Sequence, residues 1–180
     1  MPRATYDDIV KLPDFQIGEL VDGELYATPR PALRHARLAV NLIVAIATTY
    51  DHIRIGPKGW HLLFEPEIHL GDDVFVPDLA GWRMERLASI PDTAWAETEP
   101  DWICEILSPS NGHYDRAVKM PAYARYGIPY AWIVDPVLRR IDTWMRDGRE
   151  WRPTGNWPST SPILAPPFDS VAIDRTQLWT

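Results

Sequence analysis

The sequence predicts an α/β or α+β fold, in which a mixed β-sheet is flanked by helices. Three observations support this prediction. Short apolar runs with the length of strands are spread along the chain, and one long apolar helix follows the first two of them. A second helix follows a strand that is apolar on both faces. The 18 prolines among 180 residues are about twice the usual share, which predicts short elements that end sharply at turns.

The first half of the chain is expected to hold two helices, a hairpin and two longer strands. Pro13 ends the first helix, and Asp22-Gly23 is typical of a two-residue hairpin turn. Apolar residues cover most faces of the second helix, so it should pack beneath a sheet. Gly71-Asp72-Asp73 joins the two longer strands. The expected elements are a helix over 6–12, strands over 17–21 and 24–28, a helix over 32–50, and strands over 61–70 and 74–82.

The second half is expected to combine three strands with one helix. Its first strand is apolar apart from Glu105 and ends at Ser108-Pro109-Ser110-Asn111. The helix that follows should kink at Pro121, which has no backbone N–H to donate. Residues 152–167 are rich in Pro, Ser and Thr, and we expect an ordered surface loop there, because Phe168 and later apolar residues need burial. The expected elements are a strand over 102–107, a helix over 113–126, and strands over 130–134 and 140–145.

The composition, with 46% hydrophobic and 24% charged residues, indicates a soluble globular protein and excludes a disordered one. We expect a single domain over residues 1–180, with 152–180 as a C-terminal surface extension. The lone cysteine, Cys104, excludes an intrachain disulfide and a cysteine-built zinc site, and it fits a reducing cytoplasm. The longest apolar stretch, Leu38–Ala47, is about half as long as a membrane span, and the N-terminus lacks the apolar segment of a secretory signal. No membrane partner is therefore expected.

The net charge of −7 narrows the classes of partner further. It argues against wrapping of bulk nucleic acid and against binding to anionic membranes through net charge. A local basic track is still compatible with it. The cations available for such a track are Arg30, Arg34, Arg37, Lys58, Arg116 and Arg125.

Two carboxylates occupy positions that strands normally fill with apolar residues. Asp78 follows Val76-Pro77 inside an apolar run, and Glu105 lies in the middle of another. Burying an unpaired carboxylate costs several kcal/mol, so each needs a cation, a metal or a proton as its partner. Carboxylates on neighbouring strands form a natural site for Mg²⁺, which prefers oxygen ligands. Lys119 follows Asp115 by four positions, so both lie on one face of the second-half helix.

Each of these residues also has a structural interpretation that the spacing leaves open. Asp78 alone is compatible with a turn or cap residue. Glu105 alone is compatible with an exposed edge position or a salt bridge. Asp115 and Lys119 alone are compatible with an exposed helical ion pair, which contributes about 0.3–0.5 kcal/mol. The combination of Pro-Asp, an in-strand Glu and a following Lys in one chain favours the functional interpretation.

Several of these residues also form motifs of one known family. The motifs are Glu19-Leu20-Val21-Asp22-Gly23-Glu24-Leu25, His35, Val76-Pro77-Asp78, Cys104-Glu105-Ile106-Leu107-Ser108-Pro109-Ser110, Asp115 with Lys119 and Tyr123, and Tyr130-Ala131-Trp132-Ile133-Val134-Asp135-Pro136. With them, from about Tyr6 to the C-terminus, the sequence resembles the Uma2 family, a group of restriction-endonuclease-like proteins in the PD-(D/E)xK nuclease superfamily. The resemblance implies a restriction-endonuclease-like core.

The resemblance also implies a metal site. Asp78 and Glu105 match the two metal-binding acids of the superfamily, and the carbonyl of Ile106 matches its backbone ligand. The position two residues after Glu105, where the superfamily has its lysine, is Leu107 in this chain. Lys119, from the following helix, would take the place of that lysine, as it does in Uma2-like sequences.

Three further residues are candidates for the same site. His35 lies near the start of the long helix, which often bears an additional acidic or polar group in the superfamily; it is also compatible with a satisfied or exposed helical residue. Glu19 and Glu24 flank the hairpin turn, and we expect strand alternation to put them on opposite sides of it. We favour Glu24 as the one that faces the site. Asp115 would fix the position of Lys119 or make the site more negative.

These observations favour a Mg²⁺-dependent endonuclease, with Mn²⁺ as a possible substitute, that hydrolyses phosphodiester bonds in nucleic acid, with DNA as the favoured substrate. The alternative is a catalytically weak or silent module for binding or oligomerisation, which the absent strand lysine and the net charge of −7 favour. We expect a cytoplasmic homodimer, because an exposed, Trp-rich C-terminal region would offer apolar surface for pairing.

Overall fold

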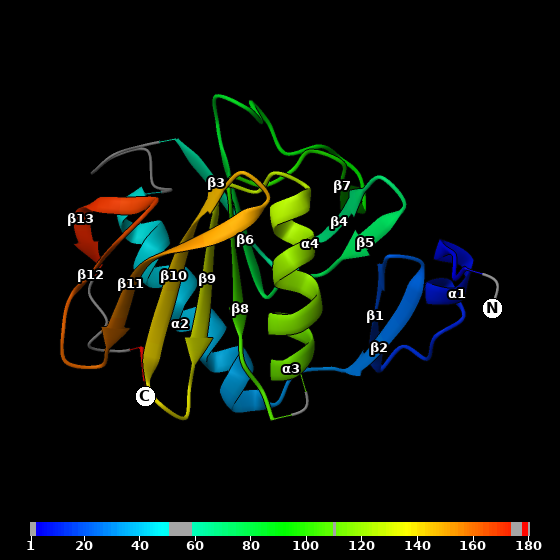
Figure 1. The fold of residues 1–180 in the computed structure, drawn as a ribbon, viewed down its shortest axis with the longest axis horizontal. Helices are drawn as coiled ribbons and strands as arrows, with labels where there is room; N and C mark the ends of the chain where they lie inside the picture. Colours follow the sequence, from blue (N-terminus) through cyan, green and yellow to red (C-terminus); the bar gives the residue numbers. More distant parts are fainter. Residues whose placement is uncertain (1–2, 51–58, 110, 174–177, 180) are drawn as a thin grey trace.

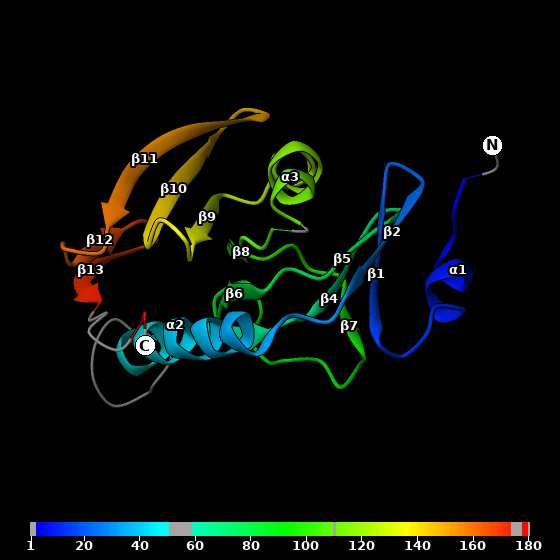
Figure 2. The ribbon, with the colours of Figure 1, turned by 90° about the horizontal axis from the view of Figure 1, so that it is seen from below.

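The computed structural model describes residues 3–50, 59–109, 111–173 and 178–179. A central six-stranded sheet separates helix α2 from the α3–α4 segment, and a second, five-stranded sheet lies beside it (Figures 1 and 2). The helical elements are α1 (Tyr6–Val10), α2 (Leu33–Tyr50), α3 (Gly112–Tyr114), the π-helical turn η1 (Asp115–Lys119) and α4 (Met120–Arg125). The helices on both faces of a mixed sheet agree with the fold class expected from the sequence.

The strand order is β11-β10-β9-β8-β6-β3 in the central sheet and β2-β1-β5-β4-β7 in the second sheet. The parallel pair β8–β9 is connected through α3, η1 and α4, so this helical segment crosses over one face of the central sheet. The strands are β1 (Gln16–Val21), β2 (Glu24–Pro29), β3 (Trp60–Phe64), β4 (Glu67–Leu70), β5 (Asp73–Phe75), β6 (Leu79–Arg83), β7 (Trp95–Ala96), β8 (Trp102–Ile106), β9 (Tyr130–Asp135), β10 (Arg140–Asp147), β11 (Glu150–Pro158), β12 (Ile163–Ala165) and β13 (Phe168–Ile173).

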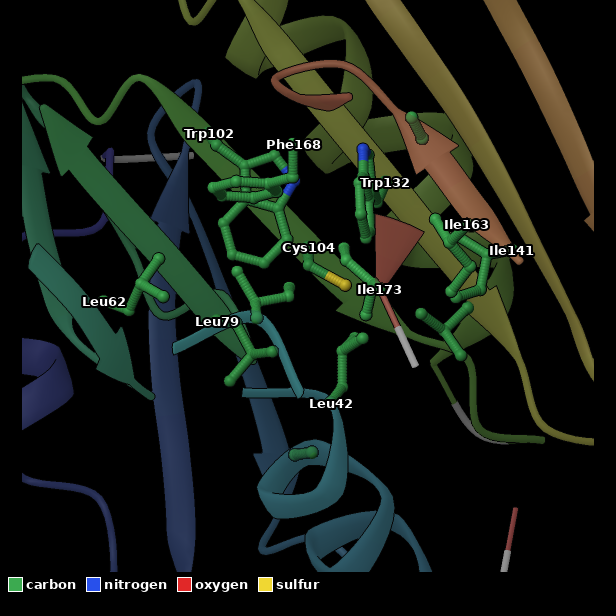
Figure 3. Close-up of a cluster of buried hydrophobic side chains, with 14 of the residues drawn as sticks. Leu42, Leu62, Leu79, Trp102, Cys104, Trp132, Ile141, Ile163, Phe168 and Ile173 are labelled. Atoms are coloured by element: carbon green, nitrogen blue, oxygen red, sulfur yellow. The ribbon is translucent and has the colours of Figure 1, made fainter. Parts of the chain in front are cut away.

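Strand β8 divides its side chains between two hydrophobic cores. Trp102 and Cys104 pack on the α2 side, where Trp102 makes an edge contact with Trp132 at a ring-centroid distance of 5.4 Å (Figure 3). Ile103 belongs to the core on the α4 side. Because side chains alternate along a strand, Glu105 faces the same side as Ile103. This alternation turns the Glu105 carboxylate toward the helix that carries Lys119.

The prediction of two longer strands over 61–70 and 74–82 is wrong, because each segment breaks at a proline and continues in the other sheet. Residues before Pro66 form β3 of the central sheet, and residues after it form β4 of the second sheet. The chain returns in the same way, through β5 of the second sheet and then, past Pro77, into β6 of the central one. Proline cannot donate to a ladder and therefore tends to end a strand. The breaks leave Glu65 and Asp78 outside the ladders.

The prediction of a surface loop over 152–167 is also wrong, because most of these residues belong to strands β11 and β12. Strand β11 pairs antiparallel with β10, from Arg140↔Pro158 to Asp147↔Glu150, with an irregularity near Thr143 and Trp144. Strand β11 lies at the edge of the central sheet, where proline is tolerated. The ribbon of β12 and β13 then buries Phe168 against the core on the α2 side.

The tryptophans of this C-terminal region do not form the exposed apolar surface expected from the sequence. Trp157 donates to the Thr143 hydroxyl at 3.3 Å, and Trp151 donates to the Met120 carbonyl at 2.7 Å. Both rings are half-buried and pack against the two cores. In the described part of the chain, no helix has the length and apolar character needed to cross a membrane.

Candidate active site

One cavity of about 680 Å³ collects most of the residues that the sequence singled out. Its walls come from the β1–β2 hairpin, the start of α2, the β3–β4 turn, the segment after β8, η1 and the β9–β10 turn. The start of α2, the end of β8 and the β9–β10 turn meet at the lower edge of the central sheet in Figure 1. The expected site residues that line it are His35, Asp78, Glu105, Ile106, Asp115 and Lys119.

Asp78 is held beside Glu105 by the pairing of β6 and β8. The last pair of that ladder is Leu79↔Cys104, and continuing the register by one residue places Asp78 opposite Glu105. Asp78 Oδ2 accepts a hydrogen bond from the backbone N–H of Ile106 at 2.6 Å, and Asp78 Oδ1 lies 2.7 Å from His35 Nε2. Both carboxylate oxygens of Asp78 are thus held in position, one by β8 and the other by α2.

Glu105 is paired with a buried ammonium group. Lys119 Nζ lies 2.9 Å from Glu105 Oε1, and both side chains are almost completely buried, with exposed fractions of 3% and 2%. The Tyr123 hydroxyl donates to the same Glu105 oxygen at 2.6 Å. Lys119 therefore supplies the cation that a carboxylate in this position requires.

Glu19 is a site residue that the sequence interpretation missed, because it favoured Glu24 of the two acids that flank the hairpin turn. Its Oε1 lies 2.9 Å from Lys119 Nζ and accepts the backbone N–H of Val76 at 2.7 Å. Lys119 in turn donates to the Val76 carbonyl at 3.2 Å. Glu19 thus ties β1, the Val76-Pro77 break and Lys119 into one buried network.

The expected orientation of Glu24 is wrong. In the hairpin register Glu19 lies opposite Tyr26 and Val21 lies opposite Glu24, so Glu19 and Glu24 share one face of the ribbon. Glu24 sits next to the turn, is exposed, and accepts a hydrogen bond from the Tyr26 hydroxyl at 2.9 Å. The turn at Asp22-Gly23 fixes this register, so counting the strand pairs outward from it would have placed Glu19 and Glu24 on one face. Glu19 is the acid farther from the turn, and it is the one that reaches the core.

The helix expected over 113–126 contains a π-helical turn instead of a simple kink. Pro121 has no N–H for the preceding turn, and the N–H of Met120 bonds to the carbonyl of Asp115, five residues back. Asp115 and Lys119 are both buried and both line the cavity. Within the described residues, the ion pairs of Lys119 go to Glu19 and Glu105, so Asp115 acts on it at longer range.

Glu65 is the second residue that the sequence interpretation missed. It lines the cavity and adopts a left-handed backbone conformation with φ of +44°, which is uncommon for a residue other than glycine. Its N–H donates to the Asp78 carbonyl at 3.0 Å. Burial, and then the charge of Asp78, raise the pKa of the Glu65 carboxyl. The Pro66 that follows it was the available signal, because it breaks the strand at this point.

Burial and mutual repulsion control protonation in the cavity. Burial raises the pKa of Glu105 well above its usual range, although Lys119 opposes the shift. For Lys119, burial favours the neutral form, but Glu105 and Glu19 outweigh it and raise the pKa. For His35, burial is likewise outweighed, chiefly by Asp78, and the pKa is raised. The cavity therefore favours the positively charged forms of Lys119 and His35, and it raises the affinity of Glu105 for a proton.

Asp115 should make the stability of the protein depend on pH. Burial raises its pKa from 3.8 to about 7, so the unfolded chain loses the proton at lower pH than the folded one. The free energy of unfolding therefore falls as the pH rises from about 4 to about 7. Replacing Asp115 with asparagine should raise the melting temperature in EDTA by on the order of 10 °C more at pH 8 than at pH 4. An equal gain at both pH values in differential scanning fluorimetry would contradict this assignment.

The oxygen donors of the cavity fit a hard divalent cation. Mg²⁺ is commonly bound by one or two carboxylates together with waters and substrate oxygens, and Asp78, Glu105 and the Ile106 carbonyl provide that type of donor set. The contacts of Glu105 with Lys119 and Tyr123 both end on Oε1. A cluster of three or more His, Cys, Asp or Glu side chains with metal-binding geometry is absent from the described residues. These oxygen donors therefore suit a metal ion that keeps part of its water shell.

The family comparison agrees with this geometry. A family model described as "Uma2: Putative restriction endonuclease" matches residues 6–174. The chain belongs to the Uma2 family. This assignment confirms the resemblance drawn from the sequence motifs, and Uma2 membership supports a nuclease.

A solved structure with the same fold is the crystal structure of a putative nuclease of DUF820 from Anabaena variabilis. It is 20% identical in sequence to this Uma2 chain, covers 97% of each chain and has a TM-score of 0.76. At this identity the likeness shows the fold, and it confirms the α/β fold class. No curated protein matches the chain.

Proposed function

We propose that the protein is a Mg²⁺-dependent endonuclease that hydrolyses phosphodiester bonds in DNA, with Mn²⁺ as an alternative metal. The observation that carries the proposal is the meeting of Asp78, Glu105 and Lys119 in one cavity, with Asp78 directly before β6 and Glu105 on the adjacent strand β8. The roles of His35 and Asp115 in the same cavity belong to this proposal. Membership of the Uma2 family supports it, since the family is described as "Putative restriction endonuclease".

The metal would be held by Asp78, Glu105 and the carbonyl of Ile106. When bound, Mg²⁺ supplies a Lewis acid that polarises a phosphoryl oxygen and makes a bound water more acidic. The protein's own part is to keep its ligands in place. His35 and the Ile106 N–H hold the Asp78 carboxylate, and Tyr123 holds that of Glu105. Such fixed partners raise both the affinity and the precision of a metal site.

Lys119 is the cation that can face the scissile phosphate. An ammonium group in a buried site stabilises negative charge that builds up on phosphate oxygens more strongly than it would in water. Glu19 and the Val76 carbonyl also hold the lysine in position. Asp115, four residues earlier on the same turn, adjusts the charge around it.

Removal of the metal tests the proposal directly. Nicking of supercoiled plasmid DNA should occur in Mg²⁺, fall below detection when EDTA is added, and return when Mg²⁺ or Mn²⁺ is supplied in excess. The physical reason is that the carboxylates alone repel the phosphate, so only the bound cation makes the cavity attractive to it. Undiminished nicking in EDTA would contradict metal dependence, and no nicking with either metal would contradict the endonuclease.

One observation favours a second candidate, a catalytically silent binding or oligomerisation module. The ammonium of Lys119 has three protons, and it already contacts Glu19, Glu105 and the Val76 carbonyl. A phosphate can then bind to Lys119 only when one of these contacts opens. Isothermal titration separates the two functions: Mn²⁺ uptake that Asp78→Asn abolishes supports the nuclease, whereas no uptake by the native chain supports the silent module.

A cytoplasmic homodimer is also part of the proposal. The exposed side chains of Val40 and Val44 on α2 offer apolar surface for pairing, in place of the tryptophans expected from the sequence. Residues four apart on a helix lie on the same face, so these two valines form one continuous patch.

A further inference from the structure

The reacting groups lie at the floor of the cavity and not on an open surface. The side chains of Glu105 and Lys119 are 2% and 3% exposed, and that of Asp78 is 16% exposed. A phosphate that reaches them brings its two flanking nucleosides at least to the mouth of the cavity. The cavity volume of about 680 Å³ is typical of sites that enclose a molecule the size of one or two nucleotides.

The rim of this cavity carries exposed apolar side chains. Leu33 is 89% exposed and lies between the lining residues Ala32 and Arg34, at the start of α2. Val137, at the β9–β10 turn, lines the cavity and is 84% exposed. We call Leu33 and Val137 the apolar rim.

An apolar rim suits bases that are not paired. In a duplex the faces of the bases are hidden in the stack, and the outside presents phosphates and sugars. In an unpaired strand the faces are accessible, and exposed aliphatic side chains can bury part of their apolar surface against them with little dependence on sequence. A pocket that encloses a base takes it from a single strand or extrudes it, because a base-paired nucleotide must first leave its partner.

Positive charge at the entrance is complementary to such a strand. Arg30 and Arg34 both line the cavity, and Arg30 Nε is fixed by a hydrogen bond to the Asp14 carbonyl at 3.2 Å. The acids Glu65, Asp78 and Glu105 lie in the same cavity. Arginines at the entrance can bind the phosphates that flank the reacting one, while the acids serve the metal.

We propose that this cavity accepts an unpaired DNA strand in preference to a continuous duplex, with the apolar rim packing against the bases and Arg30 and Arg34 binding the flanking phosphates. This inference rests on the proposed nuclease function and specifies its substrate. It also accounts for the net charge of −7, since a short enclosed contact needs two entrance arginines and not an extended basic face.

The test compares one labelled oligonucleotide of about 20 nucleotides as a single strand and as a blunt duplex, at the same salt concentration. Fluorescence anisotropy with Ca²⁺, followed by cleavage in Mg²⁺, measures binding separately from chemistry. We expect the single strand to bind at least about tenfold more tightly than the duplex and to be cut faster. The variant Leu33→Ser/Val137→Ser should weaken single-strand binding by about tenfold, because it removes the apolar surface that the bases would bury. It should leave the melting temperature unchanged, because both side chains are exposed in the free protein.

Leu164→Ser is the matched control, since Leu164 is 45% exposed on β12 and does not line the cavity. Equal or tighter binding of the duplex, or a rim variant that binds the single strand as the native chain does, would overturn the inference. If the duplex were then cleaved in Mg²⁺, the proposed nuclease function would stand and only the preference for a single strand would fail. If neither form were bound or cleaved, both proposals would fail.

Discussion

Replacing Asp78 with asparagine or Glu105 with glutamine should lower Mg²⁺-dependent DNA cleavage by about 10³-fold or more. Each change removes one negative charge from the donor set while keeping the shape of the side chain. The metal contributes several kcal/mol of transition-state stabilisation, and each 1.36 kcal/mol corresponds to a factor of ten in rate. Isothermal titration should show weaker Mn²⁺ binding by the same variants, so that the loss of activity can be traced to the loss of metal.

Asp101→Asn is the matched control for Glu105→Gln. Asp101 is a buried acid that precedes β8, four residues before Glu105, so the two share one face of the chain. Its partners are the backbone N–H of Arg83 and the Arg86 guanidinium, and it does not line the cavity. The control should retain both metal binding and cleavage. Full activity in Asp78→Asn or Glu105→Gln would remove these two residues from the proposed mechanism.

The main acids of the cavity could be predicted because they break a local pattern. Asp78 and Glu105 are carboxylates in otherwise apolar runs, and such a position requires a compensating partner. The spacing of Asp115 and Lys119 identified one face of the following helix, and both residues do lie in the cavity. Only the three-dimensional structure shows that the compensating partner of Glu105 is Lys119, because the ammonium comes from a different element of the chain.

Glu19 and Glu65 were missed because their importance depends on pairing between elements. The face that Glu19 occupies follows from the hairpin register, which alternation within one strand does not reveal. Glu65 lines the cavity because the chain changes sheets at Pro66, and a single apolar run conceals that change. The strand β11 was missed for the opposite reason, since its prolines resemble a loop but are tolerated at an edge.

Replacing Lys119 with methionine should lower the melting temperature in EDTA by on the order of 10 °C, because breaking a buried ion pair costs about 3–5 kcal/mol. Glu19 and Glu105 each lie 2.9 Å from the Lys119 ammonium, so the variant leaves two buried acids without their cation. Cleavage should also fall, by about 10²-fold, since the charge that faces the phosphate is lost. Excess Mg²⁺ should recover part of the stability, because a divalent cation can neutralise the same acids.

The double variant Glu19→Gln/Lys119→Met decides whether this loss comes from the ion pair or from packing. If the buried charges are coupled, removing the acid together with the ammonium should make the double variant more stable than Lys119→Met alone, by about half of the loss. If methionine simply packs badly in place of lysine, the second change should add to the destabilisation of the first. Chemical denaturation of the native chain, the two single variants and the double variant, all in EDTA, measures the coupling free energy directly. A coupling near zero would mean that Lys119 is not the structural counter-ion of Glu19, and its position in the cavity would need another explanation.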